Sequence, residues 1–367
     1  MLADILLALS LVYSVKIVIF GIAVFNARYP SDSSYRPSVS IVIAARNEEK
    51  TIRQCLESLA RLSYPTNLLE IVLIDDRSED RTPDIVREYS SRFNHIRLYT
   101  AAPGTGNLQG KTNAVAQGIE ESRGEILLFT DADCSVPTRW VEETVKYYTD
   151  ASIGIVAGFT ALKVRRWFEA IQALDWFVLF SVAAATIRLK YPVTAVGNNL
   201  SVRREAYNKV GGYRNIPFSV TEDYALFHAI TKHSGYRALF PLDHSTLVES
   251  DPCKDWHELY RQKKRWFTGG KGMDLRSLLV FTIPFVFNSV LVLSMLFAPS
   301  YATFCAAFLK TSVDLFLAIP SIKRFKRWSL MRYFPVFEMY YTLYVLLFPI
   351  VVLFGKEVVW KDRTFGN

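Results

Sequence analysis

The sequence predicts an α/β protein in which a doubly wound, mostly parallel sheet is flanked by transmembrane helices. In the middle of the chain, short apolar runs rich in β-branched residues alternate with stretches of helical periodicity, which is typical of such sheets. Half of the 367 residues are hydrophobic, and the longest apolar stretches are confined to the two ends of the chain. We therefore expect a soluble domain of roughly 200–250 residues between membrane segments.

Three apolar runs in the central region have the length of strands, and each ends in polar residues. They are VSIVIAA (39–45), LEIVLIDD (69–76) and EILLFTDAD (125–133). In a doubly wound sheet, ligands bind outside the carboxyl ends of the strands. The polar clusters that follow the runs should therefore surround one crevice: 46–49, 75–80 and 131–133.

Asp131 and Asp133 stand one residue apart at the end of the third run. Two carboxylates at a strand end can hold one divalent cation, whose remaining oxygen ligands come from a substrate diphosphate. Taken alone, such a pair is also typical of a solvated loop. Asp75 and Asp76 have an alternative role as well, because Asp residues before a helix accept hydrogen bonds from its free N–H groups.

The N-terminal segment is predicted to be a transmembrane anchor covering residues 1–27. Residues 5–25 carry one charge, Lys16, and a helix of this length spans about 30 Å, the thickness of the bilayer core. Asp4 before the run, with Arg28 and Arg36 after it, favours an uncleaved anchor over a signal peptide. The positive-inside rule then places the N-terminus outside and the following domain in the cytosol.

The C-terminal region, residues 276–355, is predicted to hold about three spans: 278–297, 301–320 and 334–354. A basic loop between the last two marks the cytosolic side, whereas the equally basic tail, 356–367, conflicts with an outward last span. Pro335, Glu338 and Pro349 also allow a re-entrant or broken helix. The number of spans and the side of the tail stay open.

The net charge of +8 does not indicate nucleic acid as a partner, because the basic residues cluster beside the apolar spans. Anionic lipid head groups fit that distribution better. The four cysteines are scattered without paired spacing, so we expect neither a disulfide framework nor a zinc site.

Seven ordered motifs of the chain resemble those of the family-2 glycosyltransferases, and in particular their membrane-bound branch of cellulose and hyaluronan synthases and ceramide glucosyltransferases. They are SIVIAARNEEKTI, VLIDDRSEDRT, GKTNAV, LFTDADCSVP, VGNNLSVRREAYNKVGGY, TEDYAL and QKKRW. The resemblance covers residues 37–275 and implies a cytosolic domain of the GT-A fold, a Rossmann-like nucleotide-diphospho-sugar transferase. It also implies an inverting, metal-dependent hexosyltransferase.

The resemblance assigns one set of residues to the nucleotide-sugar donor and its metal ion. Asp131 and Asp133 match the motif that binds diphosphate and Mg²⁺ or Mn²⁺, Asp133 being the more direct ligand. Lys111 matches a lysine that approaches the donor, although a surface lysine at a helix start has the same pattern. The remaining donor-binding positions are Ala44, Arg46, Glu48 and Asp76.

The resemblance assigns a second set of residues to the step in which the sugar is transferred. In an inverting transfer, an acceptor hydroxyl attacks the anomeric carbon and one carboxylate takes its proton. Asp223 matches this general base, with Glu222 beside it. Gln262, Arg265 and Trp266 match the QxxRW motif, in which the arginine suits the leaving diphosphate. A basic surface helix is the alternative interpretation of that segment. Residues 197–207, GNNLSVRREAY, are expected in the wall around the donor sugar and acceptor, with a Gly-Asn turn before a helix as the alternative.

Residues 168–187 are apolar but interrupted by Glu169 and Asp175, and Trp176 suits head-group depth. We interpret them as an interfacial helix, with a transmembrane segment as the alternative.

The predicted protein is a multi-pass enzyme of the inner or plasma membrane that moves a hexose from a UDP-sugar to a membrane lipid at the cytosolic leaflet. The alternative is a processive polysaccharide synthase that extends and exports a glycan. A non-catalytic scaffold is disfavoured because Asp133, Asp223 and Arg265 are all present. The oligomeric state stays open.

Overall fold

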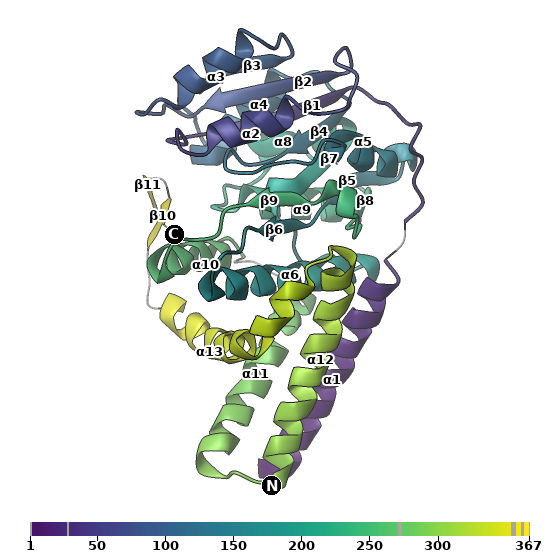
Figure 1. The fold of residues 1–367 in the computed structure, drawn as a ribbon, viewed down its shortest axis with the longest axis vertical. Helices are drawn as coiled ribbons and strands as arrows, with labels where there is room; N and C mark the ends of the chain where they lie inside the picture. The colour runs from purple at the N-terminus through teal and green to yellow at the C-terminus, as the bar shows by residue number, and fades with distance from the viewer. Residues whose placement is uncertain (1, 28, 271–273, 354–356, 361–362, 367) are drawn as a thin grey trace.

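The structure is a computed structural model that describes residues 2–27, 29–270, 274–353, 357–360 and 363–366. Figure 1 shows three levels: an α/β domain at the top, a layer of transverse helices beneath it, and a group of upright helices that carries the N-terminus at its far end. The predicted fold class, an α/β domain with flanking apolar helices, is confirmed.

The α/β domain is built on a seven-stranded sheet of order β3-β2-β1-β4-β7-β5-β8. Strands β1 to β4 run parallel to one another, whereas β7 is antiparallel to both β4 and β5. A small parallel pair, β6 and β9, lies on the side toward the transverse helices. The strands are β1 Val39–Ala45, β2 Leu69–Asp75, β3 Ile96–Thr100, β4 Ile126–Phe129, β5 Ile153–Ala157, β6 Thr160–Leu162, β7 Leu200–Arg203, β8 Arg237–Leu239 and β9 Val248–Ser250.

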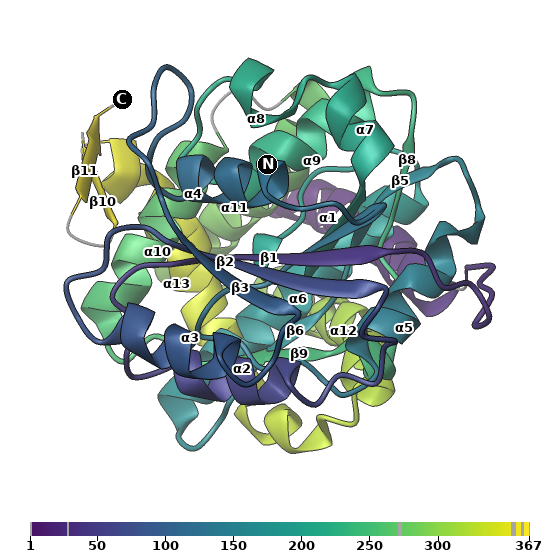
Figure 2. The same cartoon turned by 90° about the horizontal axis from the view of Figure 1, so that it is seen from above.

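Helices cover both faces of this sheet, as the sequence periodicity predicts. Figure 2 shows α2 and α3 on one side of the parallel strands and α4 on the other. Ile41 and Ile43 of β1 are buried with the first group, and Val42 between them is buried with α4, because strand side chains alternate between faces. The helices of this domain are α2 Ile52–Leu59, α3 Thr82–Ser90, α4 Gly110–Glu120, α5 Trp140–Val145, α7 Arg204–Lys209, α8 Gly212–Asn215 and α9 Glu222–His233.

The transverse layer contains α6 Trp167–Arg188, α10 Trp256–Gly269 and α13 Phe334–Leu353. The predicted interfacial helix is α6, and protein covers it almost completely. Ser181 shares a hydrogen bond of 2.8 Å with Ser321 of an upright helix, and Trp176, expected at head-group depth, is only 5% exposed. Thus α6 lies between the α/β domain and the upright helices and packs against both.

The upright helices are α1 Leu2–Phe25, α11 Leu275–Phe297 and α12 Tyr301–Arg324. They contain the predicted anchor and the spans predicted at 278–297 and 301–320. Within the described residues, four helices are long and apolar enough to cross a membrane: α1, α6, α11 and α12. The segment predicted as a third C-terminal span forms α13, which lies across the upright helices rather than along them (Figure 1).

Short elements complete the chain. In the predicted tail, β10 Glu357–Trp360 pairs antiparallel with β11 Arg363–Gly366, and β10 lies beside α10. Residues 354–356, 361–362 and 367 lie outside the described residues. The 3₁₀ turns are Lys146–Thr149, Gly197–Asn199, His244–Thr246 and Trp328–Tyr333.

Candidate active site

The polar clusters predicted to meet at one crevice follow strands that end at the same edge of the sheet. Ala45 pairs in parallel register with Asp75, the last residue of β2, and Val42 pairs with Phe129, the last residue of β4. The register therefore places the segments after β1, β2 and β4 side by side, as the sequence predicts.

The loops after β1 and β2 are tied together by hydrogen bonds. Arg46 donates from Nη1 to the carbonyl oxygens of Asp76 (2.8 Å) and Arg77 (3.0 Å), so its guanidinium supports the loop that carries Asp76. The Asp76 side chain is 2% exposed. Asp75 instead accepts hydrogen bonds from the backbone N–H of Ser78 in the loop before α3, and not from N–H groups of the helix itself, which the alternative role required.

A cavity at this sheet edge brings together five of the residues singled out from the sequence. Its lining includes Ala44, Lys111, Asp131, Glu222 and Asp223. The ammonium group of Lys111 lies 2.6 Å from Asp131 Oδ1 and 2.8 Å from Glu222 Oε1. Lys111 is therefore no surface lysine: it bridges two carboxylates that come from different strands and helices.

The Asp223 carboxylate is held by two backbone N–H groups. Gly197 donates to Oδ2 (2.6 Å), and Tyr224 donates to Oδ1 from the first turn of α9 (2.8 Å). A Cβ atom at position 197 would lie 2.7 Å from the Asp223 Cβ, so only glycine permits this approach. Burial and the neighbouring charge of Glu222 raise the pKa of Asp223 to about 6, while Lys111 and Arg265 act in the opposite direction.

The asparagines that follow Gly197 serve the fold. Asn198 accepts a hydrogen bond from Thr160 (2.8 Å), and Asn199 accepts one from the indole of Trp140 (3.0 Å). Both are almost fully buried. The residues of this segment that line the cavity are Gly197 and Leu200, and the backbone of Gly197 also holds the Asp223 carboxylate.

Asp133 lies beside Asp131 and Glu48 in a buried, acidic corner. Burial, followed by the negative charges of Asp131 and Glu48, raises the pKa of Asp133 to about 6, and the Cys134 thiol donates to its Oδ1 at 3.4 Å. Such mutual repulsion between carboxylates is relieved by a divalent cation, and carboxylate oxygens are the ligands that Mg²⁺ and Mn²⁺ prefer. Within the described residues, no group of three His, Cys, Asp or Glu side chains forms a complete cage. The donor set fits a cation that takes its other ligands from a substrate.

Helix α10 brings the QxxRW residues to the same region. Its last residue, Gly269, packs so closely on Thr221, next to the start of α9, that a Cβ there would lie 1.9 Å from the Thr221 hydroxyl. Arg265 is near enough to lower the pKa of Asp223. Gln262 has a buried side-chain oxygen without a hydrogen-bond partner among the described residues.

Trp266 turns away from Arg265, toward the helices below. Its ring packs on Trp176 of α6, with 5.8 Å between ring centroids, and the Lys263 ammonium lies 4.6 Å from its centroid. Lys263 also forms a buried ion pair with Asp175 of α6. The sequence interpretation did not predict this pair, because it treated Lys263 as one of several cations on a basic helix.

Two family models match the chain. Residues 40–211 match the model described as glycosyl transferase family 2, and residues 126–355 match that described as glycosyl transferase family group 2. The chain is a family 2 glycosyltransferase. The predicted family and enzyme class are confirmed.

Among curated proteins, the glycosyltransferase is similar to "Probable glycosyltransferase YdaM" of Bacillus subtilis, with 30% identity over 67% of this chain and 58% of the relative. It is also similar to "Glycosyltransferase AglE" of Haloferax volcanii (27% identity; 65% and 74%). A third relative is "Beta-monoglucosyldiacylglycerol synthase" of Trichormus variabilis (30%; 64% and 49%). The match thus spans about half to three quarters of the length of these relatives.

Among solved structures, the glycosyltransferase is similar to mannosyltransferase PcManGT of Pyrobaculum calidifontis, in complex with GDP-Man and Mn²⁺. The TM-score is 0.61 at 21% identity, over 93% of this chain and 99% of that chain. The likeness confirms the predicted GT-A fold.

Proposed function

We propose that this glycosyltransferase moves a hexose, with inversion at the anomeric carbon, from a UDP-sugar to a hydroxyl group of a membrane lipid. The observation that carries the proposal is the fixed position of Asp223. Two backbone N–H groups orient its carboxylate in a cavity that also contains Lys111 and Asp131. A preorganised carboxylate beside a site for a diphosphate is what an inverting transfer requires.

In the proposed reaction, the acceptor oxygen forms a bond to the anomeric carbon on the face opposite the donor's diphosphate. The bond between that carbon and the diphosphate oxygen breaks, the electron pair leaves with the nucleoside diphosphate, and Asp223 takes the hydroxyl proton. Lys111 and Arg265 stabilise the charge on the leaving group. Gln262 is proposed to close the site from α10, and Glu222 holds Lys111 in position. Trp266, predicted to close the site as well, instead packs on Trp176 of α6.

The remaining predicted residues hold the donor. Ala44, Glu48 and Asp76 lie at or beyond the ends of β1 and β2 and are proposed to bind the nucleoside, with Arg46 supporting the loop of Asp76. Asp131 and Asp133 are the residues that would hold a divalent cation. When bound, the cation supplies positive charge to the diphosphate. The Mn²⁺ in the complex of the mannosyltransferase PcManGT supports this assignment.

Metal dependence has a direct test. We expect EDTA to abolish sugar transfer, and Mn²⁺ or Mg²⁺ added in excess to restore it, because Asp131 and Asp133 repel each other and the diphosphate when no cation is present. Full activity of the chelated enzyme, checked for residual metal by elemental analysis, would contradict the assignment.

The proposed acceptor and location follow from the layers of the molecule. The transverse helices lie between the α/β domain and the upright apolar helices, so a lipid can reach the cavity from the membrane side. The relative named "Beta-monoglucosyldiacylglycerol synthase" supports a lipid acceptor. We place the enzyme as a multi-pass protein of the inner or plasma membrane, with the α/β domain in the cytosol.

The proposed function is tested with the detergent-purified enzyme, Mn²⁺, membrane lipid extract and radiolabelled UDP-sugars. Label in one solvent-soluble band supports transfer of a single sugar to a lipid and identifies the donor. Label in a water-soluble product of high mass would contradict the proposal in favour of a processive synthase. The same incubation with GDP-mannose tests the proposed preference for UDP.

A further inference from the structure

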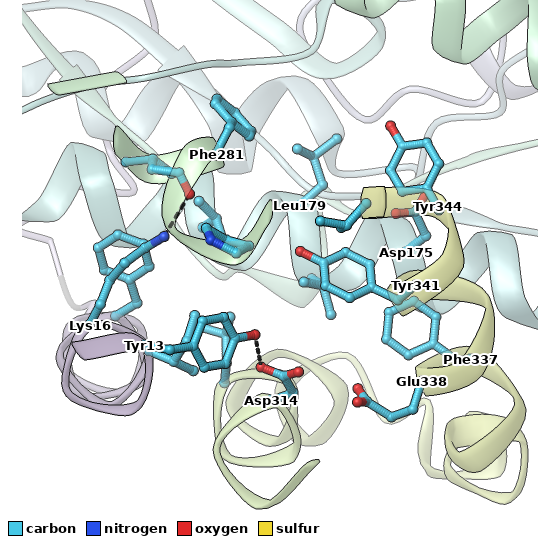
Figure 3. A pocket seen from close by; sticks show the side chains of 18 of the residues that line it. Tyr13, Lys16, Asp175, Leu179, Phe281, Asp314, Phe337, Glu338, Tyr341 and Tyr344 are labelled. Carbon is cyan, nitrogen blue, oxygen red and sulfur yellow. Dashed lines mark hydrogen bonds between the residues drawn. The ribbon is translucent and has the colours of Figure 1, made fainter. Parts of the chain in front are cut away.

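A second cavity lies beneath α10, where the transverse helices meet the upright ones. It measures about 140 Å³, and α1, α6, α10, α11, α12 and α13 all contribute to its wall. We call it the head-group pocket. Figure 3 shows aromatic and aliphatic side chains around it, with charged groups pointing inward. Its lining includes five Lys, Asp and Glu side chains: Lys16, Asp175, Lys263, Asp314 and Glu338.

Most of the polar atoms in the pocket are paired with one another. Asp314 Oδ1 accepts a hydrogen bond from the Tyr13 hydroxyl (2.5 Å), and Asp314 Oδ2 accepts one from Lys310 (2.8 Å). Lys310 also donates to Glu338 Oε2 (2.5 Å). Asp175 is paired with Lys263 on the side nearest α10. The cluster thus links α1, α12 and α13 by buried hydrogen bonds.

Two groups keep hydrogen-bonding capacity. Glu338 is 8% exposed, and its Oε1 atom is buried with no hydrogen-bond partner among the described residues. Lys16 donates to the carbonyl oxygen of Val280 (2.6 Å), which uses one of its three N–H bonds. Buried polar atoms in proteins are normally paired, and ionisable residues facing the inside of an apolar helix bundle mark ligand sites. The pocket therefore offers one acceptor and a nearby donor to a ligand.

The charges of the pocket select the class of ligand. Lys16 and Lys310 balance Asp314 and Glu338, and Lys263 balances Asp175. A phosphate group would add negative charge next to two carboxylates in a setting of low dielectric constant, where an unbalanced charge is costly. An uncharged head with a hydroxyl and a neighbouring carbonyl matches the free acceptor and donor without disturbing the balance.

We infer that the head-group pocket binds the head of the acceptor lipid, an uncharged lipid with a free hydroxyl group, before the sugar is transferred. This inference rests on the proposed function and narrows its substrate class. The lipid hydroxyl donates to Glu338 Oε1, and Lys16 donates to an ester or amide carbonyl of the same head. Polyprenyl phosphates, which are anionic, are excluded from the pocket.

The pocket adjoins both the membrane and the candidate active site. Trp266 lines the pocket, and the preceding residue, Arg265, is near enough to Asp223 to lower its pKa, so α10 contributes to both the pocket and the active site. On the outer side, a groove of about 420 Å³ shares Lys263 and Tyr344 with the pocket and is otherwise almost entirely apolar. Trp167 and Met339 in this groove are more than half exposed. The groove is the place for an acyl chain of the same lipid.

The test measures initial rates in detergent micelles with radiolabelled donor and dioleoylglycerol as the acceptor. We expect Glu338→Gln and Lys16→Met to raise the KM for dioleoylglycerol about tenfold each and to leave the KM for the donor unchanged. Leu179, which points into the pocket in Figure 3, provides a variant without a charge change. Leu179→Phe should raise the same KM, whereas Leu309→Phe, on the outward side of α12, should not.

The outcomes separate this inference from the proposed function. If the wild-type enzyme labels no lipid at all, the proposed function fails and the inference fails with it. If the wild type labels dioleoylglycerol while the three pocket variants keep its KM, only the inference is overturned. Preferential labelling of undecaprenyl phosphate would also overturn it. A diazirine-bearing diacylglycerol that crosslinks to α13 or α1 of the wild type, with competition by dioleoylglycerol, supports the pocket independently of any variant's folding.

Discussion

Two places in the molecule use the same local arrangement, a lysine between two carboxylates, in different surroundings. In the α/β domain, Lys111 bridges Asp131 and Glu222, its side chain is 19% exposed, and it faces an open cavity. Among the apolar helices, Lys310 joins Asp314 and Glu338, and its side chain is 3% exposed. The first arrangement lies beside further acidic groups, whereas the second is close to charge balance.

The difference indicates that the two lysines have different tasks. In the proposed function, Lys111 exchanges a carboxylate for a phosphate oxygen, which its partial exposure and its position in the cavity lining would allow. Lys310 has no such alternative: without it, two carboxylates would remain in an apolar interior. We therefore propose that Lys111 exchanges partners during donor binding, whereas Lys310 keeps its partners and fixes the position of the helices around it.

The largest expected effect is that of replacing Asp223, the proposed proton acceptor. Asp223→Asn keeps the shape of the side chain, but its single carbonyl oxygen can accept only one of the two hydrogen bonds from Gly197 and Tyr224. Because the substitution also removes the proton acceptor, we expect kcat to fall about 10³–10⁴-fold. Binding of the donor, measured by isothermal titration with UDP and Mn²⁺, should stay within twofold. Glu222→Gln is the matched control, with a much smaller loss. Normal turnover of Asp223→Asn would remove Asp223 from the mechanism.

Lys310→Met tests the structural side of the comparison. Leaving Asp314 and Glu338 without their common partner should lower the free energy of unfolding by about 3–5 kcal/mol. Thermal unfolding in detergent measures the change. Lys323→Met on the same helix, where the side chain is exposed, should stay within about 0.5 kcal/mol. Equal stability of the two variants would contradict the proposed role of Lys310.

Lys111→Met should lower the activity and leave the stability nearly unchanged, in contrast to the loss of stability expected for Lys310→Met. We expect kcat/KM for the donor to fall about 100-fold, because a cation at the leaving diphosphate is lost. The midpoint of thermal unfolding should change little, since solvent or a metal ion can serve Asp131, whose side chain is 35% exposed. Lys111→Arg, which keeps the charge, should recover part of the activity. A loss of stability as large as that of Lys310→Met would break the distinction between the two clusters.

The smallest expected effect is on the dependence of kcat/KM on pH. Since Asp223 must be unprotonated to act as a base and its pKa is raised to about 6, kcat/KM should fall about tenfold per unit as the pH drops below about 6. The profile is measured at saturating Mn²⁺. Glu222→Gln removes a neighbouring negative charge and should move this limb to lower pH. An unshifted limb in that variant would assign the titration to another group.

The sequence predicted the features that depend on local periodicity and ordered motifs. The alternating strands and helices, the polar strand ends and the apolar segments are all visible in runs of a few residues, such as 39–45 or 125–133. The position of Asp131 at the same sheet edge as the segments after β1 and β2 followed from the general geometry of parallel sheets. Ala44, Lys111 and Asp223 were assigned to the site by the family resemblance, and they line one cavity with Asp131.

Other features depend on contacts between distant residues and could not be predicted in this way. Gly197 approaches Asp223 across 26 positions, and Lys263 meets Asp175 across 88. Hydropathy does not show how a helix is oriented in space. The segment of α13 was therefore expected to be a third span, with a re-entrant or broken helix as the alternative, whereas α13 and α12 are differently oriented (Figure 1). Tertiary packing decides each of these, and no local pattern encodes it.

Helix α10 contributes to both the active site and the head-group pocket, and this has a consequence for how strongly the sugar donor and the lipid bind. Arg265 and Trp266 are consecutive residues of one rigid helix, yet one acts on Asp223 and the other lines the head-group pocket. Any displacement of α10 that accompanies donor binding also reshapes the lipid's pocket. Thermodynamic linkage then requires that the lipid change the affinity of the donor by the same factor as the donor changes that of the lipid. An enzyme built this way would hold its sugar donor most tightly when a lipid is waiting, and so limit the hydrolysis of donor molecules that have no acceptor.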